Sequence, residues 1–181
     1  MEAPDQTTNE VEGQLAELHT ASYGWACSCC GWNEADAQDV LQKTYVKVLS
    51  GRARYDGRSV FRTWLFGVIR HTAREHARGH RSQEKRAELL ALDGASDRPE
   101  VERPDERMEK QEQARRLRTA LAKLPERQRE VLDLVFYQDL TIKEAAAVME
   151  VSIGSARVHY DRGKKRLRKL LDADLGVGGS R

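Results

Sequence analysis

The sequence predicts an all-α protein of two small helical domains joined by a flexible acidic linker. Aromatic residues make up only 6% of the 181 residues and charged residues 33%, so any core is thin and built mainly from leucine, valine and alanine. This composition suits helical bundles better than a β-sandwich, which needs many β-branched and aromatic residues. In addition, apolar residues recur at the 3.6-residue period of an amphipathic helix on both sides of an acidic, proline-containing stretch.

The first domain is expected over residues 14–83, after a disordered acidic lead at 1–13. A first helix is expected over 14–30. Asn33 is placed to cap a second helix, and Ser59 to cap a third after a loop rich in glycine and arginine. The inward stripes of the second and third helices are expected to be Ala37, Val40, Leu41, Thr44 and Val48, and Phe61, Trp64, Leu65, Val68 and Thr72.

Residues 84–111 are expected to form the linker, because they carry glycine, prolines and many acids without a sustained apolar stripe. The second domain is expected over 112–174, with a short tail at 175–181. Within it, Thr141 and Glu144 fit a capping box at the start of a short helix.

The last two helices are expected to be separated by about three residues and to match a helix-turn-helix. Ser152 caps the second of them, and its inward face is expected to be Ala156, Tyr160, Gly163, Leu167 and Leu171. The residues off this face that could meet DNA are Ser155, Arg157, Val158, His159, Asp161 and Arg162, with Lys165 among the cations that follow. Arginines there suit guanine edges or phosphates, and a valine suits a thymine methyl. The alternative is a solvated helix with ordinary surface lysines.

The net charge of +2 hides a strong segregation of charge. Residues 51–86 carry ten Lys and Arg against three acids, and residues 157–169 carry seven against one. Two basic blocks separated by an acidic spacer predict two surfaces for a polyanion. In the first block, the loop residue Tyr55 is the best candidate to stack on an unpaired base. For Phe61 and Trp64 we favour core packing.

Three motifs occur in order along the chain: ADAQDVLQKTYVKVL, FRTWLFGVIRHTA and LPERQREVLDLVFYQDLTIKEAAAVMEVSIGSARVHYDRGKKRL. Together they resemble an extracytoplasmic-function (ECF) sigma factor, a bacterial transcription initiation subunit, over about residues 14–172. The resemblance implies that the first domain is sigma domain two and the second is sigma domain four. It also implies that the protein binds RNA polymerase core and directs it to promoters. There it would recognise the minus-thirty-five duplex and the melted minus-ten strand.

The resemblance further implies three sets of site residues. The polymerase-binding set is Asp39, Val40, Gln42, Lys43 and Thr44. The minus-ten set is Tyr55, Arg58, His71, Arg74, Glu75 and Arg78. The minus-thirty-five set is Ser155, Arg157, Val158, His159, Asp161, Arg162 and Lys165. Glu150 stands where the family usually has a turn glycine, which costs about 1 kcal/mol if that position needs a positive φ. Lys43 and His71 also depart from the usual acid and asparagine.

The three cysteines, Cys27, Cys29 and Cys30, do not make a secreted disulfide framework. We favour structural cysteines, with a zinc or thiol-switch site of Cys27, Cys30 and His19 as the alternative. His76 and its neighbouring histidines lie amid arginines that would repel a cation. Neither a metal nor another cofactor is therefore expected.

A subunit of this kind is not an enzyme: it favours strand opening by binding the melted state better than the duplex. We expect a cytoplasmic protein without membrane insertion, monomeric outside the polymerase, whose partners are the polymerase core, promoter DNA and an anti-sigma factor. The rival hypothesis is a helix-turn-helix repressor with a cysteine-based metal or redox sensor, which would bind duplex DNA alone as a dimer. An enzyme acting on nucleic acid is disfavoured, because no nucleophile–base arrangement or phosphate loop is evident.

Overall fold

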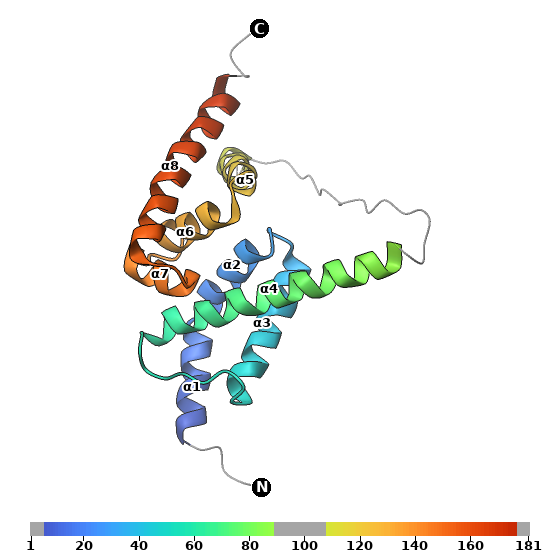
Figure 1. Ribbon diagram of the computed structural model, residues 1–181, viewed down its shortest axis with the longest axis vertical. Coiled ribbons are helices and arrows are strands. Elements are labelled where there is room, and N and C mark those ends of the chain that lie inside the picture. Colours follow the sequence, from blue (N-terminus) through green and yellow to red (C-terminus); the bar gives the residue numbers. More distant parts are fainter. Residues whose placement is uncertain (1–5, 89–107, 177–181) are drawn as a thin grey trace.

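The computed structural model describes residues 6–88 and 108–176, and within them it contains helices and no strand (Figure 1). The all-α prediction is confirmed. The first half of the chain holds α1 (Gln6–Glu17), α2 (His19–Cys29), α3 (Glu34–Leu49) and α4 (Phe61–Glu88). The second half holds α5 (Met108–Ala122), α6 (Glu126–Phe136), α7 (Ile142–Met149) and α8 (Ile153–Gly176).

Local capping interactions set several helix boundaries. Oδ1 of Asn33 accepts a hydrogen bond from the backbone of Asp36 at 3.2 Å, which starts α3 as predicted. Thr141 and Glu144 form the predicted reciprocal capping box of α7. Ser152 caps α8, since its hydroxyl accepts from a backbone N–H of the first turn at 3.1 Å. These side chains satisfy backbone donors that the helices leave unpaired at their N-termini.

Other boundaries differ from the prediction. Residues 6–13, expected in a disordered lead, form the first turns of α1, which is held by burial of Leu15 in the core. The single helix expected next is interrupted at Leu18, whose ψ of 1° is not helical. α4 begins at Phe61, so Ser59 lies before the cap position rather than at it.

The expected linker, 84–111, is shorter in the structure, because α4 continues to Glu88 and α5 begins at Met108. Its remainder, 89–107, lies outside the described residues, as do 1–5 and 177–181.

The two halves pack against each other rather than standing apart. α7 lies against α4, and α6 contacts α2 (Figure 1). One core cluster combines Trp25, Leu65 and Phe66 of the first half with Val131 and Met149 of the second. A smaller cluster holds α5 and α8 on α6. The long helix α4 is thus the element through which the two halves meet.

Asp133 of α6 is buried at the boundary between the halves. Burial raises the pKa of its carboxyl from the usual 3.8 to about 6, although hydrogen bonds with the Ser28 and Gln138 side chains act in the opposite direction. Because the folded chain binds this proton more tightly than the unfolded chain, the stabilisation it gives is fully present below about pH 4. It is lost as the pH rises through about 6.

We expect Asp133→Asn, whose side chain stays uncharged, to raise the free energy of unfolding more at neutral pH than in acid. The gain should be about 2 kcal/mol larger at about pH 7.5 than at about pH 4, as measured by urea denaturation. An equal change at both pH values would show that the carboxyl is not titrating in this range.

Glu150 ends α7 with a left-handed backbone, φ 55° and ψ 47°, in the turn before α8. Glycine adopts this conformation without the steric penalty of about 1 kcal/mol that a Cβ brings. We therefore expect Glu150→Gly to raise the free energy of unfolding by about 1 kcal/mol in chemical denaturation. Glu150→Ala keeps the Cβ and serves as the matched control. If alanine stabilises as much as glycine, the backbone is not the cause.

Candidate nucleic-acid and protein interfaces

Two arginines of α4 are paired with two glutamates of α6 across the boundary between the halves. Nε of Arg70 donates to Oε1 of Glu130 at 2.7 Å, and the two side chains are only 3% and 7% exposed. Nη2 of Arg74 donates to Oε1 of Glu126 at 2.6 Å nearer the solvent. Burial raises the pKa of Glu126, but the hydrogen bond from Arg74 and the positive charges of the nearby arginines together hold this pKa below its usual range. We call these two ion pairs the α4–α6 clamp.

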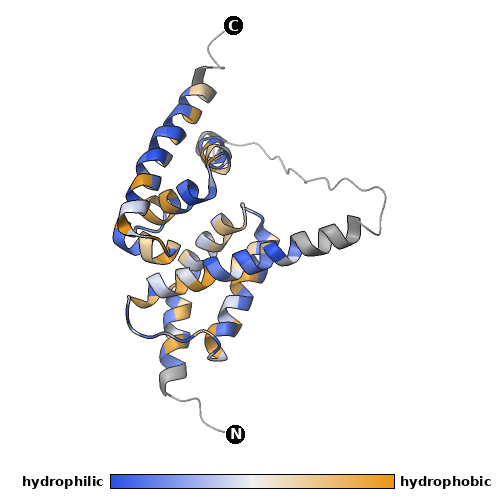
Figure 2. Ribbon diagram, in the orientation of Figure 1, coloured by the Kyte–Doolittle hydropathy of each residue, from blue (hydrophilic) through white to orange (hydrophobic). Residues whose placement is uncertain are grey.

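The outer face of α8 carries the residues predicted to read duplex DNA. Exposed there are Ser155, Arg157, Val158, Asp161, Arg162 and Lys165, while His159 is half-buried. Figure 2 shows hydrophilic residues along much of this helix. On the opposite side, a Cβ on Gly163 would lie 3.2 Å from Cδ1 of Leu132 and 3.3 Å from the backbone oxygen of Gln128. Glycine thus allows α8 to approach α6 closely, with its basic face turned to solvent.

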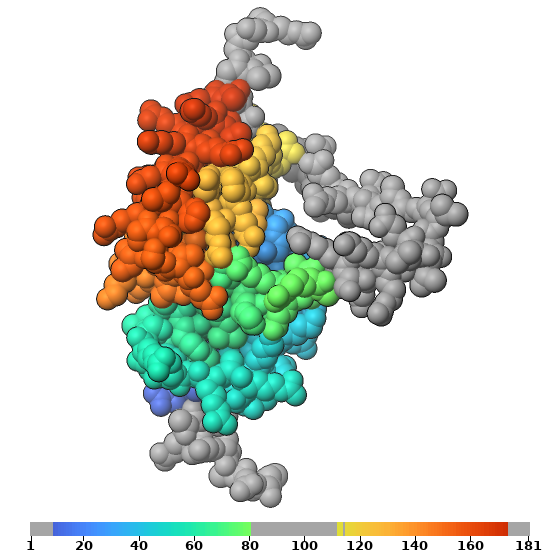
Figure 3. Space-filling view, viewed as in Figure 1, coloured from blue at the N-terminus to red at the C-terminus, as the bar shows by residue number. Residues whose placement is uncertain are grey.

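Tyr55 lies in the loop between α3 and α4, which reaches the surface in Figure 3. Its ring meets Phe61 edge-on, with 5.3 Å between ring centroids, and lies 5.4 Å from the ring of Trp64. The side chain is 41% exposed, and Arg58 in the same loop is exposed as well. Phe61 is buried and Trp64 half-buried, in agreement with core packing. The loop therefore exposes the ring of Tyr55, which packs on the rings of Phe61 and Trp64.

The remaining predicted minus-ten residues lie on α4. Nε2 of His71 is 3.2 Å from Oε1 of Glu75, and Lys47 of α3 donates to the same carboxylate. The hydrogen bond from Lys47 lowers the pKa of Glu75. Nε of Arg78 donates to the backbone oxygen of Arg74 at 3.3 Å. His71 and Arg78 are exposed, whereas Arg74 is held in the α4–α6 clamp.

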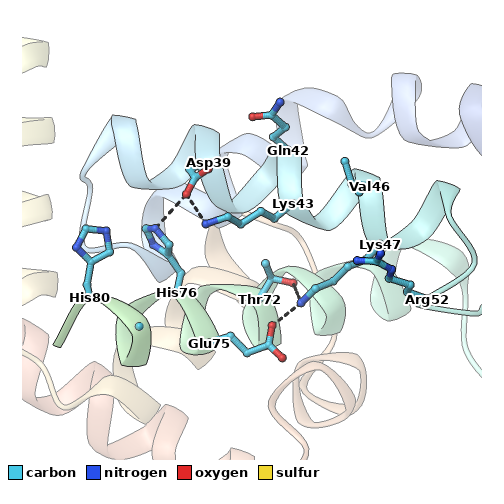
Figure 4. Close-up of a pocket in the computed structure, with 11 residues that line it drawn as sticks. Asp39, Gln42, Lys43, Val46, Lys47, Arg52, Thr72, Glu75, His76 and His80 are labelled. Carbon is cyan, nitrogen blue, oxygen red and sulfur yellow. Dashed lines mark hydrogen bonds and ion pairs between the residues drawn. The ribbon is translucent and has the colours of Figure 1, made fainter. Parts of the chain in front are cut away.

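A groove of about 740 Å³ between α3 and α4 includes Asp39, Gln42 and Lys43 of the predicted polymerase-binding set (Figure 4). Nζ of Lys43 donates to Oδ2 of Asp39 at 2.6 Å, and this bond lowers the pKa of Asp39. Val40 and Thr44 of the same set are fully buried in the structure, so their side chains are not at the surface of this groove. Both belong to the apolar stripe of α3, and the 3.6-residue period of that stripe already indicated that their side chains face the core.

Burial also raises the pKa values of the cysteine thiols. It raises the pKa of Cys30 to about 12 and that of Cys29 well above the usual value. A raised pKa disfavours the thiolate, which is the form that binds zinc and reacts with oxidants. Nδ1 of His19 is 3.2 Å from the hydroxyl of Tyr45. Within the described ranges, His19, Cys27 and Cys30 are not gathered into a possible metal-binding group.

The sequence matches two family models, Sigma-70 region 2 over residues 17–83 and Sigma-70, region 4 over residues 114–167. The ECF RNA polymerase sigma factor SigX of Bacillus subtilis is 32% identical over 138 residues, which cover 75% of this chain and 70% of the relative. The chain is an ECF sigma factor. Another similar sigma factor is CnrH of Cupriavidus metallidurans, 30% identical over 169 residues that cover 90% of this chain and 87% of the relative.

Two solved structures resemble this sigma factor over nearly its whole length. One is CnrH in complex with the cytosolic domain of CnrY, with a TM-score of 0.62 and 28% identity over 90% of this chain and 88% of that one. The other is the sigma factor RpoE of Bartonella quintana in complex with the anti-sigma factor NepR. Its TM-score is 0.70 at 21% identity, over 91% of this chain and 98% of that one. This second likeness concerns the fold.

As an ECF sigma factor, the protein is a promoter-directing transcription initiation factor, a family role that involves RNA polymerase and promoter DNA. Sigma factors are not enzymes. The presence of both regions in order does not favour the repressor hypothesis. Among the helices described here, none is both long and apolar enough to cross a membrane.

The α4–α6 clamp leads to a prediction about how the two halves of the chain are held together. In Glu130→Ala, Arg70 loses its buried partner and keeps only the longer contact, at 3.7 Å, with the exposed Glu150. We expect this loss to cost about 3–5 kcal/mol unless the halves separate and water reaches the guanidinium. We expect the halves to separate, so that the radius of gyration measured by small-angle X-ray scattering increases while helical circular dichroism is retained. The matched control is Glu112→Ala, which removes a carboxylate paired within α5. An unchanged radius in Glu130→Ala would show that the clamp does not hold the halves together.

Proposed function

We propose that this sigma factor contacts its promoter through two surfaces. The outer face of α8 reads the minus-thirty-five duplex, with Arg157 and Arg162 at base edges or phosphates. The α3–α4 loop and the adjoining face of α4 bind the melted minus-ten strand, with an unpaired base stacked on Tyr55. The observation that carries the proposal is that the capped, basic helix α8 and the exposed loop residue Tyr55 lie on different halves of one chain.

The division of labour follows the two halves. Residues 14–83 form the polymerase- and minus-ten-binding domain, and 112–174 the minus-thirty-five-binding domain, joined through 84–111. Asp39, Gln42 and Lys43 supply the side chains of α3 that meet the polymerase. Their position along one groove wall, away from the buried stripe of the helix, supports this assignment.

Promoter binding requires the α4–α6 clamp to release. Arg74 belongs to the strand-binding face of α4, yet it is paired with Glu126 of the other half. DNA phosphates compete with Glu126 for this guanidinium once polymerase holds the halves apart. We propose that an anti-sigma factor keeps the chain closed until then. The likeness to CnrH solved with the cytosolic domain of CnrY, over both halves together, supports this.

The sigma factor acts in the cytoplasm, is monomeric outside the polymerase and performs no chemistry of its own. Unstacking a base costs a few kcal/mol, and contacts made only with the melted strand offset that cost. At the minus-ten site, its contribution is therefore to bind the open state better than the duplex.

The proposal is tested by run-off transcription with purified core polymerase on fragments of the source genome, with and without the chain. Promoter-specific transcripts should depend on the chain. Arg157→Ala should reduce them about tenfold, since one base or phosphate contact is worth about 1–3 kcal/mol. Tyr55→Ala should reduce permanganate-sensitive strand opening and leave protection of the minus-thirty-five duplex unchanged. Lys123→Ala, an exposed change in the turn between α5 and α6, is the matched control.

Two results would contradict the proposal. Tight duplex binding by the chain alone as a dimer would favour a repressor. Equal strand opening in the Tyr55→Ala variant and the parent would remove the loop from the minus-ten site.

A further inference from the structure

The groove between α3 and α4 ends in a cluster of side chains that promoter recognition does not use. Asp36, His76 and His80 each offer one ligand atom, and these atoms lie within 4.8 Å of one another. In the part of the chain that the structure describes, this is the one such group of three or more histidine, cysteine and acidic residues. It combines residues of α3 and α4, and Asp36 and His76 are forty positions apart in the sequence.

The two histidines are positioned by helix geometry. His76 and His80 are four residues apart on α4, so both project from the same face toward α3, as Figure 4 shows. Their ring centroids are 4.6 Å apart. Oδ1 of Asp36, from the first turn of α3, is 3.9 Å from Nε2 of His80. The three side chains are 34%, 11% and 54% exposed in chain order, so an ion can enter from solvent.

Two imidazoles and a carboxylate form a common ligand set for zinc, and nitrogen ligands favour transition ions over magnesium or calcium. Ligands around a tetrahedral zinc ion are about 3.3 Å apart. The side chains therefore need only small rotations to enclose an ion, with water completing the coordination.

A neighbouring carboxylate supports the group. Oδ2 of Asp39 accepts a hydrogen bond from Nε2 of His76 at 3.1 Å. Carboxylates in this position orient a metal-binding imidazole and increase its basicity. Lys43 is paired with the same carboxylate, which offsets its positive charge.

Two arginines of α4 that the sequence places near these histidines are directed away from them in the structure. Arg70 and Arg74 turn to the other side of the helix and pair with glutamates of α6. These two guanidinium groups are thus separated from the imidazoles of His76 and His80, a separation that counting charges along the chain does not show.

We propose that Asp36, His76 and His80 bind one divalent transition-metal ion, with Zn²⁺ the best match. The bound ion links the N-terminal turn of α3 to the middle of α4. It lies at the rim of the groove that also holds Asp39, Gln42 and Lys43.

The test uses the full chain without a histidine tag, freed of metal by a chelator and titrated with Zn²⁺ in a calorimeter. We expect one equivalent to bind, and His80→Ala and Asp36→Asn each to weaken binding at least tenfold. Both side chains are partly exposed, so the variants should keep the helical circular dichroism of the parent. His19→Ala, an exposed histidine outside the group, is the matched control and should bind Zn²⁺ as the parent does.

Co²⁺ provides a second readout, because its visible spectrum reports the donor atoms. A nitrogen- and oxygen-ligated spectrum that His80→Ala abolishes supports the proposal. A thiolate-to-cobalt charge-transfer band, loss of binding in His19→Ala, or undiminished Zn²⁺ binding in His80→Ala would each overturn it. Neither polymerase nor DNA is present, so the result is independent of the function proposed above.

Discussion

The buried ion pair between Arg70 and Glu130 is the interaction on which the arrangement of the whole chain depends. Each charge loses several kcal/mol of hydration when it is buried, and the attraction between them offsets this loss only while they remain in contact. The pair therefore makes the closed arrangement specific, while the apolar core that the two halves share favours their contact. Separation of the halves returns both charges to water, so neither is left buried and unpaired.

This balance matters because the surfaces of the sigma factor are not equally available when it is closed. The outer face of α8 and the ring of Tyr55 are exposed, whereas Arg74 is engaged by the opposite half. If the two faces bind DNA as proposed, the closed chain has the α8 face exposed and part of the α4 face covered. A chain with an open and a closed arrangement shifts toward the one that its partner binds better. In the proposal, polymerase with DNA binds the open arrangement and an anti-sigma factor binds the closed one.

Local signals explain why so much of the fold could be predicted from sequence. The Asn33 cap, the Thr141–Glu144 capping box and the stripe of α8 each act within a few residues, and each is present in the structure. The closure of the halves could not be predicted, because charged residues sixty positions apart leave no periodic trace. The group of Asp36, His76 and His80 could not be predicted for the same reason. The spacing of the two histidines is evident in the sequence, but the packing of α3 against them is not.

Gly163 has a consequence for how this protein can change over evolutionary time. Since its missing side chain lets α8 lie directly on the backbone of α6, the angle of the recognition helix is fixed from the inside, by a position that never meets DNA. Under the proposed function, substitutions on the solvent side of α8 would change the promoter that the protein recognises one base at a time. A larger residue at this single inner position would tilt every such contact together.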